Sequence, residues 1–183
     1  MATTEIKIGG LGGQGVILAG MIIGKAAALF DHKDATLTQA FEPEARSSAC
    51  SAQVIVSDGK ILYPYVTHPD IMVSLSQDAY ARFVPELKPD GVLIIEKDLV
   101  QPAGLPATTT VYGVPATRIA EELGRKMVLN IVVVGFFAAV VKLVGVDAMR
   151  QALKVSVPSG TEELNLKAFD RGYQYGVDNY PRA

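Results

Sequence analysis

The residues best suited to chemistry lie in a glycine-rich turn near the start of the chain. A strand-like run, Glu5–Gly9, leads into a turn with four glycines between positions 10 and 15, and an apolar, helix-compatible run follows from Val16. Glycines accept positive φ and allow other atoms close to the backbone, because they lack Cβ. The first N–H groups of a helix and its dipole favour an anion bound at the helix N-terminus. The turn therefore predicts either an anion site or a surface on which another backbone lies.

The spacing also fits the dinucleotide-binding pattern G-x-G-x-x-G, read from Gly10. That fold needs an acidic residue at the end of the second strand, about 20 residues further on, to bind the ribose hydroxyls. Asp31 and Asp34 precede the expected second strand, Ala35–Phe41, and Glu42 comes late. A nicotinamide- or flavin-binding protein, with Glu42 on the ribose, therefore stays open as an alternative.

Composition narrows the class of protein. The 183 residues suit one domain, and 17 basic against 19 acidic residues give a net charge of −2, which gives no sign of nucleic-acid binding. The hydrophobic fraction is 49%, high for a chain with only 20% charged residues, so we expect a large subunit interface. A single cysteine and the lack of an export-like start predict a cytoplasmic protein.

A membrane span is the alternative explanation for the longest apolar run, Met127–Val141. This run has 15 residues and contains Asn130 and Gly135. About 20 apolar residues are needed to cross a bilayer. A helix that is apolar on nearly all sides is otherwise one buried within protein. We therefore predict a core or interface helix and no membrane segment.

Strand-like and helix-like segments alternate through the first two-thirds of the chain, and helix-like segments dominate the last third. Such alternation is typical of a mostly parallel sheet covered by helices. We predict one α/β domain, residues 1–183, with helices on both faces of the sheet and a helical C-terminal third. The expected strands are Ile6–Gly9, Ala35–Phe41, Ser51–Ser57 with Ile61–Tyr63 as a hairpin continuation, Asp70–Leu75, Val92–Ile95 and Thr108–Tyr112. The expected helices are Val16–Phe30, Asp78–Leu87, Pro115–Leu123, an apolar helix ending near Val144, Asp147–Lys154 and Glu162–Tyr175.

The chain offers few residues for chemistry of its own. Two histidines, His32 and His68, and the lone Cys50 cannot form a thiolate-rich zinc site, and no Cys-x-x-Cys is present for zinc or iron–sulfur. A Gly-Asp-Gly motif of the thiamine diphosphate type is also missing. Cys50 is either a thiol activated by Arg46 or a small buried hydrophobe. We expect no catalytic residue and no metal site in this chain.

Four motifs occur in a fixed order and together carry a family resemblance. They are Gly-Leu-Gly-Gly-Gln-Gly-Val from Gly10, Pro-Glu-Ala-Arg from Pro43, Asp70–Tyr80, and Gly124–Asn130 ahead of the apolar helix. The chain resembles the gamma subunit of 2-oxoacid:ferredoxin oxidoreductases over nearly its whole length. One departure is that Ser47 and Ser48 follow Arg46 where the family usually has two glycines.

The resemblance implies one subunit of a larger enzyme. Enzymes of this family decarboxylate a 2-oxoacid on thiamine diphosphate, pass electrons through iron–sulfur clusters to ferredoxin, and transfer the acyl group to coenzyme A. The resemblance places those cofactors on separate alpha, beta and ferredoxin-like delta chains, or on domains fused to this one. We therefore expect this chain to bind none alone and to be inactive alone. A homodimer of the isolated chain is possible. The chain does not fix the 2-oxoacid, and the resemblance favours 2-oxoglutarate over pyruvate and 2-oxoisovalerate.

The resemblance and the glycine turn together predict a site. We expect the glycine turn and the segment Glu44–Ser48 to lie side by side at the carboxyl ends of adjacent parallel strands, where ligands of such sheets collect. There, the backbone N–H groups of Gly13 to Val16, the side-chain amide of Gln14 and the Arg46 guanidinium would bind an anionic part of coenzyme A. The alternative is that Arg46 pairs with Glu42 or Glu44 and the glycines only permit close packing. The predicted site residues are Gly12, Gly13, Gln14, Gly15, Glu44, Arg46, Ser47 and Ser48.

Overall fold

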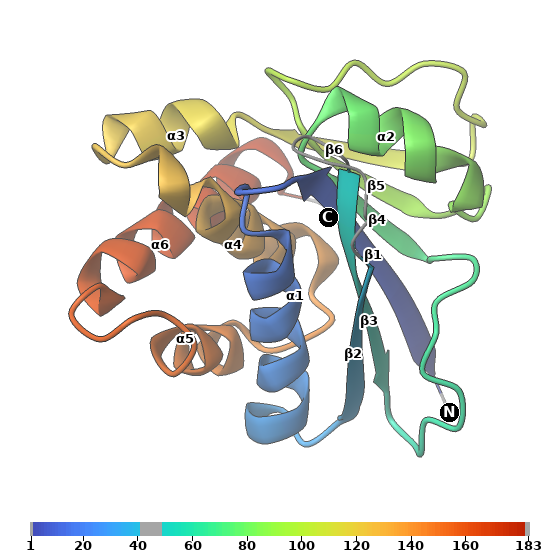
Figure 1. Cartoon of the computed structure of the whole chain (residues 1–183), viewed down its shortest axis with the longest axis horizontal. Coiled ribbons are helices and arrows are strands. Elements are labelled where there is room, and N and C mark those ends of the chain that lie inside the picture. Colours follow the sequence, from blue (N-terminus) through green and yellow to red (C-terminus); the bar gives the residue numbers. More distant parts are fainter. Residues whose placement is uncertain (1, 41–48, 182–183) are drawn as a thin grey trace.

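The computed structural model describes residues 2–40 and 49–181, and in these ranges the chain folds around one six-stranded mixed sheet (Figure 1). The strands lie in the order β2-β3-β1-β4-β5-β6. Their bounds are β1 (Thr3–Leu11), β2 (Asp34–Ala40), β3 (Ala49–Ser57), β4 (Ile71–Ser74), β5 (Val92–Glu96) and β6 (Thr110–Val114).

All described strands except β3 run in the same direction. The pairs β1–β4, β4–β5 and β5–β6 are parallel, whereas β3 pairs antiparallel with both β1 and β2. The predicted α/β fold with a mostly parallel sheet is therefore confirmed. The strands β1, β4, β5 and β6 all finish at the same end of the sheet, which we call the carboxyl end.

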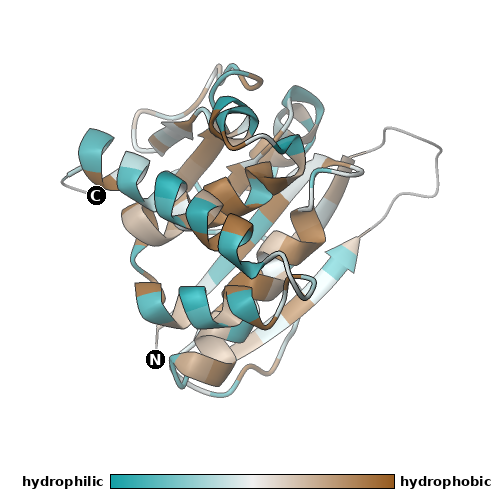
Figure 2. Ribbon diagram, turned by 90° about the vertical axis from the view of Figure 1, so that its left-hand side faces the viewer, coloured by the Kyte–Doolittle hydropathy of each residue, from teal (hydrophilic) through white to brown (hydrophobic). Residues whose placement is uncertain are grey.

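Helices cover the two faces of the sheet unequally. One face carries α1, α3, α4, α5 and α6, and the other carries α2 (Figure 1). Polar residues line the outer sides of the outer helices, whereas apolar residues lie inside (Figure 2). The bounds are α1 (Val16–Lys25), α2 (Gln77–Phe83), α3 (Ala116–Glu122), α4 (Leu129–Val141), α5 (Val146–Lys154) and α6 (Glu162–Asn179). Short turns of π- or 3₁₀-helix follow α1, at η1 (Ala26–Phe30), and α2, at η2 (Val84–Glu86), and precede α4, at η3 (Lys126–Val128).

The predicted hairpin continuation at Ile61–Tyr63 is wrong. This segment forms no strand, because both edges of β3 are already paired, with β1 and with β2. The chain instead continues as a loop that is attached to the sheet by two backbone donors. The Val66 N–H donates to Oε1 of Gln53, and the Thr67 N–H donates to a carboxylate oxygen of Glu5.

The apolar helix α4 lies at the centre of the thicker layer, as its sequence predicts. Its residues from Asn130 to Val140 are all buried. It packs closely on α6, because Gly135 lies against the backbone carbonyl of Phe169 and Gly172 lies against that of Val132. In the described ranges, no helix has the length and apolar character needed to cross a membrane.

Candidate functional site

The glycine turn connects the end of β1 to the start of α1 at the carboxyl end of the sheet. Gly13 and Gly15 have φ values of 90° and 72°, in the region that favours glycine. The N–H of Gln14 donates to the Leu11 carbonyl oxygen at 3.1 Å and closes the turn. The Gln14 N–H is therefore unavailable to the anion nest that we expected from Gly13 to Val16.

The side chain of Gln14 holds the turn in shape. Its Oε1 accepts a hydrogen bond from the Leu11 N–H at 2.7 Å, and its Nε2 donates to the Leu75 carbonyl oxygen at 3.1 Å. Leu75 directly follows β4, so this contact joins the ends of two neighbouring parallel strands. These contacts engage both ends of the amide that we expected to face a ligand.

Asn130, at the start of α4, is a second residue whose side chain stabilises the turn. It was not among the predicted site residues. Its Nδ2 donates to the Gly15 carbonyl oxygen at 3.1 Å. Any side chain at position 15 would collide with Asn130, so glycine is required there for space as well as for φ. The signal was present in the sequence, because Asn130 ends one of the four motifs that carry the resemblance.

The outer part of the turn is open. Gly12 and Gly13 are exposed, and a Cβ at either position would meet no atom of the described residues within 4 Å. Helix α1 begins beside them without a side-chain cap and without an acidic residue in its first turn. The exposed surface of the turn is therefore bare backbone next to the positive end of a helix dipole.

Four predicted site residues, Glu44, Arg46, Ser47 and Ser48, lie outside the described residues. The expected arrangement of adjacent parallel strands is wrong, because β3 lies between β1 and β2. The eight residues 41–48 that connect β2 to β3 are too few for a parallel crossover, which needs a dozen or more, so the two strands pair as antiparallel neighbours. Ala49, the first residue of β3, pairs with Leu11, the last residue of β1.

Cys50 lies in the same region, where it pairs with Gly10 across β3 and β1. The thiol is half-buried, and burial raises its pKa, which opposes formation of the reactive thiolate. The side chain packs against the main core cluster. The structure therefore favours the interpretation of Cys50 as a small hydrophobe.

Glu96, at the end of β5, is a buried carboxyl and was not among the predicted site residues. The residue is fully buried; Oε1 accepts a long hydrogen bond of 3.4 Å from the Thr117 N–H. Within the described part of the chain, Oε2 and the Thr117 hydroxyl have no partner. Burial raises the pKa of Glu96, against the opposing effect of the Thr117 N–H. The residue ends an apolar strand, and nothing in its spacing marks it as buried.

Comparison with known proteins identifies the family. The model of the family described as pyruvate ferredoxin/flavodoxin oxidoreductase matches residues 5–175. The chain belongs to this family. It is a gamma-type subunit of a 2-oxoacid:ferredoxin oxidoreductase, as the resemblance implied, and enzymes of this family use thiamine diphosphate and iron–sulfur clusters.

Relatives of the same length support this assignment to the family. A 2-oxoglutarate synthase subunit KorC of Methanocaldococcus jannaschii is 46% identical over 93% of this chain and 92% of its own length. A pyruvate synthase subunit PorC of Methanothermobacter thermautotrophicus is 34% identical over 93% and 94%. The crystal structure of the keto/oxoacid ferredoxin oxidoreductase gamma subunit of Geobacter sulfurreducens is 34% identical, with a TM-score of 0.86 over 97% and 98% of the two chains.

Within the described ranges, this family member has no group of three or more histidine, cysteine, aspartate or glutamate side chains placed to hold a metal ion.

Proposed function

We propose that this chain is the gamma subunit of an enzyme that decarboxylates 2-oxoglutarate, forms the acyl-coenzyme A and CO₂, and reduces ferredoxin. The observation that carries this proposal is the relative named as a 2-oxoglutarate synthase subunit, 46% identical over nearly the whole chain. Relatives named as pyruvate synthase subunits reach 34% and 30%, and those named as ketoisovalerate oxidoreductase subunits reach 28%. The proposed partners are the alpha, beta and ferredoxin-like delta chains.

The substrate is tested on the complex assembled from the four subunits. Rates with 2-oxoglutarate, pyruvate and 2-oxoisovalerate, at equal coenzyme A and ferredoxin, rank the three substrates. We expect the highest kcat/KM for 2-oxoglutarate. A preference for pyruvate or 2-oxoisovalerate would contradict the assignment of the substrate and leave the assignment of the subunit standing.

Within the complex, we propose that the glycine turn helps to hold an anionic part of coenzyme A. Three features support this: the bare backbone of Gly12 and Gly13, the uncapped start of α1, and the rigid bracing of the turn by Gln14 and Asn130. A preorganised backbone loses little entropy when it binds, which favours a ligand site. Arg46, with Ser47 and Ser48, would add a cation and hydroxyl donors to the same ligand.

Two substitutions test this site in the assembled enzyme. Arg46→Ala removes the cation, and Gly12→Asp adds a negative charge where a side chain has open space. We expect each to raise the KM for coenzyme A at least about fivefold, since a lost charge-assisted contact is worth about 1–3 kcal/mol. The matched control is Ala107→Asp, an exposed position in the turn before β6. This turn lies at the amino ends of the parallel strands, away from the glycine turn.

The outcomes separate binding from scaffolding. If both variants assemble and keep the KM for coenzyme A and the turnover of the unmodified enzyme, the anion site is wrong. If they fail to assemble while Ala107→Asp assembles, the turn is a subunit contact instead.

The alternative of a free-standing nicotinamide- or flavin-binding protein is weakened by the sheet order. In that fold, the second strand lies beside the first and presents the ribose-binding acid next to the glycine turn. Here β3 lies between β1 and β2. Calorimetric titration of the isolated chain with nicotinamide and flavin nucleotides tests this directly, and micromolar binding of either would support the alternative.

A further inference from the structure

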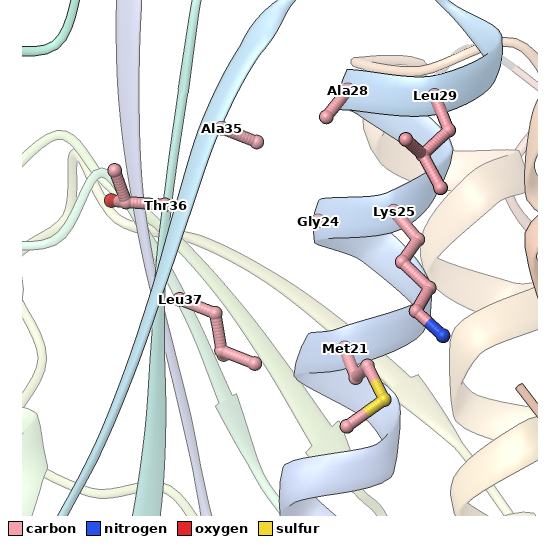
Figure 3. A pocket seen from close by; sticks show the side chains of 8 residues that line it. All are labelled: Met21, Gly24, Lys25, Ala28, Leu29, Ala35, Thr36 and Leu37. Atoms are coloured by element: carbon pink, nitrogen blue, oxygen red, sulfur yellow. The ribbon is translucent and has the colours of Figure 1, made fainter.

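An apolar groove runs along one edge of the sheet, between β2 and the helical segment α1–η1. Its volume is about 230 Å³. Figure 3 shows Ala35 and Leu37 on the strand side of the groove, facing Met21, Ala28 and Leu29 on the helical side, while Thr36 points to the other face of the sheet. Leu29 and Leu37 are 58% and 36% exposed. The groove therefore leaves apolar surface from two layers, strand and helix, in contact with water.

β2 is also an edge strand that, among the described residues, lacks the usual protection against pairing. Natural sheet edges are blunted by prolines, charges or covering groups, because unpaired N–H and C=O groups bind further strands. Between Ala35 and Ala40, the strand has no proline and no charged residue. β2 pairs on one side only, with β3.

The opposite edge of the sheet is protected. The Gly113 N–H of β6 donates to the Tyr180 hydroxyl at 3.0 Å, and that hydroxyl donates to the Gly113 carbonyl oxygen at 3.2 Å. One side chain thus occupies both polar groups of an edge residue. Among the described residues, no such contact covers the outer side of β2. Among the described residues, a side chain therefore covers part of the β6 edge of the sheet, whereas none covers the β2 edge.

We propose that β2 pairs with β2 of a second copy of this chain, antiparallel, about a two-fold axis at Leu37. In this register Leu37 lies opposite its own copy, Thr36 opposite Thr38, and Ala35 opposite Gln39. The only charged residue of the strand, Asp34, comes opposite Ala40, so no like charges face each other within the strand pair; Lys25 lies on the helical side of the groove. The two sheets then join into one, and the axis is perpendicular to the sheet, so both α1 helices lie on the same face.

A second copy fits the groove better than a single added strand. A bare strand would pair with β2 and leave Leu29 exposed, because Leu29 belongs to the helical layer. A second copy brings its own α1–η1 segment across the axis and covers the helical side as well as the strand side. Strand and helix of the partner therefore match the two layers of exposed apolar surface.

The size of the contact predicts a weak dimer. Seven residues at about 3.4 Å each give an edge about 24 Å long, and a strand with its helical layer is about 15 Å deep. The footprint is then roughly 400 Å² on each copy, or about 800 Å² in total, which is below the size of stable specific interfaces and within the range of weak, transient ones. We expect a dissociation constant on the order of tens of micromolar.

Sedimentation of the isolated full-length chain over a concentration series tests the proposal. The unmodified chain should change from monomer to dimer, and Leu37→Asp, which places two like charges on the axis, should weaken dimerisation at least about tenfold. Val111→Asp is the matched control, because Val111 is 37% exposed on the opposite edge strand, β6. A chain that stays monomeric at all concentrations, or a Leu37→Asp chain that dimerises as well as Val111→Asp, overturns the proposal.

A cross-link provides a second measurement that does not depend on the stability of the Leu37→Asp variant. In antiparallel strands, directly opposed Cα atoms lie about 4.5–5.5 Å apart, which a disulfide can bridge. In a Cys50→Ser background, Leu37→Cys should form a disulfide-linked dimer on mild oxidation, much faster than Val111→Cys. Equal rates for the two would contradict the two-fold axis at Leu37. Neither measurement involves substrate or coenzyme A, so this test is independent of the proposed function.

Discussion

The side-chain amide of Asn130 donates a hydrogen bond of 3.1 Å to the carbonyl oxygen of Gly15, across 115 residues of chain. This contact joins the start of α4 to the start of α1 and fixes the last residue of the glycine turn. The same proximity leaves no room for a side chain at position 15. The shape of the turn therefore depends on the apolar helix layer as well as on its own glycines.

Gly15→Ala should destabilise the fold. Alanine at φ 72° is strained by about 1–2 kcal/mol, and its methyl group would displace Asn130 at a further cost of about 1–3 kcal/mol. Urea unfolding followed by circular dichroism measures the loss. Gly12→Ala is the control and should change the free energy of unfolding by less than about 0.5 kcal/mol, because it adds a methyl group in open space.

The two causes can be separated in an Asn130→Ala background. There the collision is gone and only the backbone strain remains, so Gly15→Ala should cost less than in the unmodified chain. An equal cost in both backgrounds would show that the contact with Asn130 does not limit position 15.

Gly135→Ala and Gly172→Ala should each destabilise the crossing of α4 and α6. The added methyl groups would meet the carbonyl groups of Phe169 and Val132, which belong to helix backbones and can move only if the helices separate. We expect a loss of about 2–3 kcal/mol or more for each. Gly24→Ala in α1 is the control, since its nearest neighbour would be Cγ1 of Val54 at 3.9 Å; there the higher helix propensity of alanine should stabilise by about 0.5–1 kcal/mol. Thermal unfolding of the three variants gives the comparison.

Glu96→Gln should stabilise the fold, relative to the unmodified chain, increasingly as the pH rises. Burial raises the pKa of Glu96, so the folded chain keeps this proton at a pH where the unfolded chain has already lost it. The free energy of unfolding of the unmodified chain therefore falls as the pH rises from the pKa of an exposed glutamate to the raised pKa of the folded chain. Glutamine does not titrate and avoids this loss.

Urea unfolding at about pH 5 and about pH 8 measures the effect. The difference in free energy between Glu96→Gln and the unmodified chain should be larger at the higher pH. Asp58→Asn, at an exposed turn, is the control for a lost carboxylate. A difference that is constant with pH, or that shrinks as the pH rises, would show that Glu96 does not titrate as its burial requires.

Tyr180→Phe should weaken the β6 edge without disturbing the ring contacts of Tyr180 with Tyr112 and Phe136. The variant leaves the N–H and C=O of Gly113 without the hydroxyl, at a cost of about 1–2 kcal/mol. Hydrogen exchange at the Gly113 amide should accelerate. Tyr63→Phe, at a residue 62% exposed, is the control and should have little effect on stability.

Much of the fold could be predicted from local pattern. The apolar runs at β4 and β5 are short and rich in β-branched residues, and the run at α4 is long, so strand and helix follow from length and composition. The position of the glycine turn between β1 and α1 was predicted correctly, because its residue types suit few other conformations. Family membership also followed from local motifs, since their order along the chain needs no tertiary information.

The neighbours of β1 were decided only by the tertiary structure. Strand propensity does not predict which strands pair. The sequence pattern therefore did not distinguish β3, which is antiparallel, from the parallel strands. The roles of Gln14 and Asn130 were hidden for the same reason. An amide can serve a ligand or a distant backbone, and only the positions of Leu75 and Gly15 show that these two serve the backbone. Glutamate is an ionisable residue that is usually exposed. Glu96 is buried because the start of α3 lies against it, where the Thr117 N–H donates to its carboxyl group. The sequence thus determined which elements form and which family they belong to. Long-range packing decided which polar groups remain exposed to a partner, because hydrogen bonds between distant segments occupy the others.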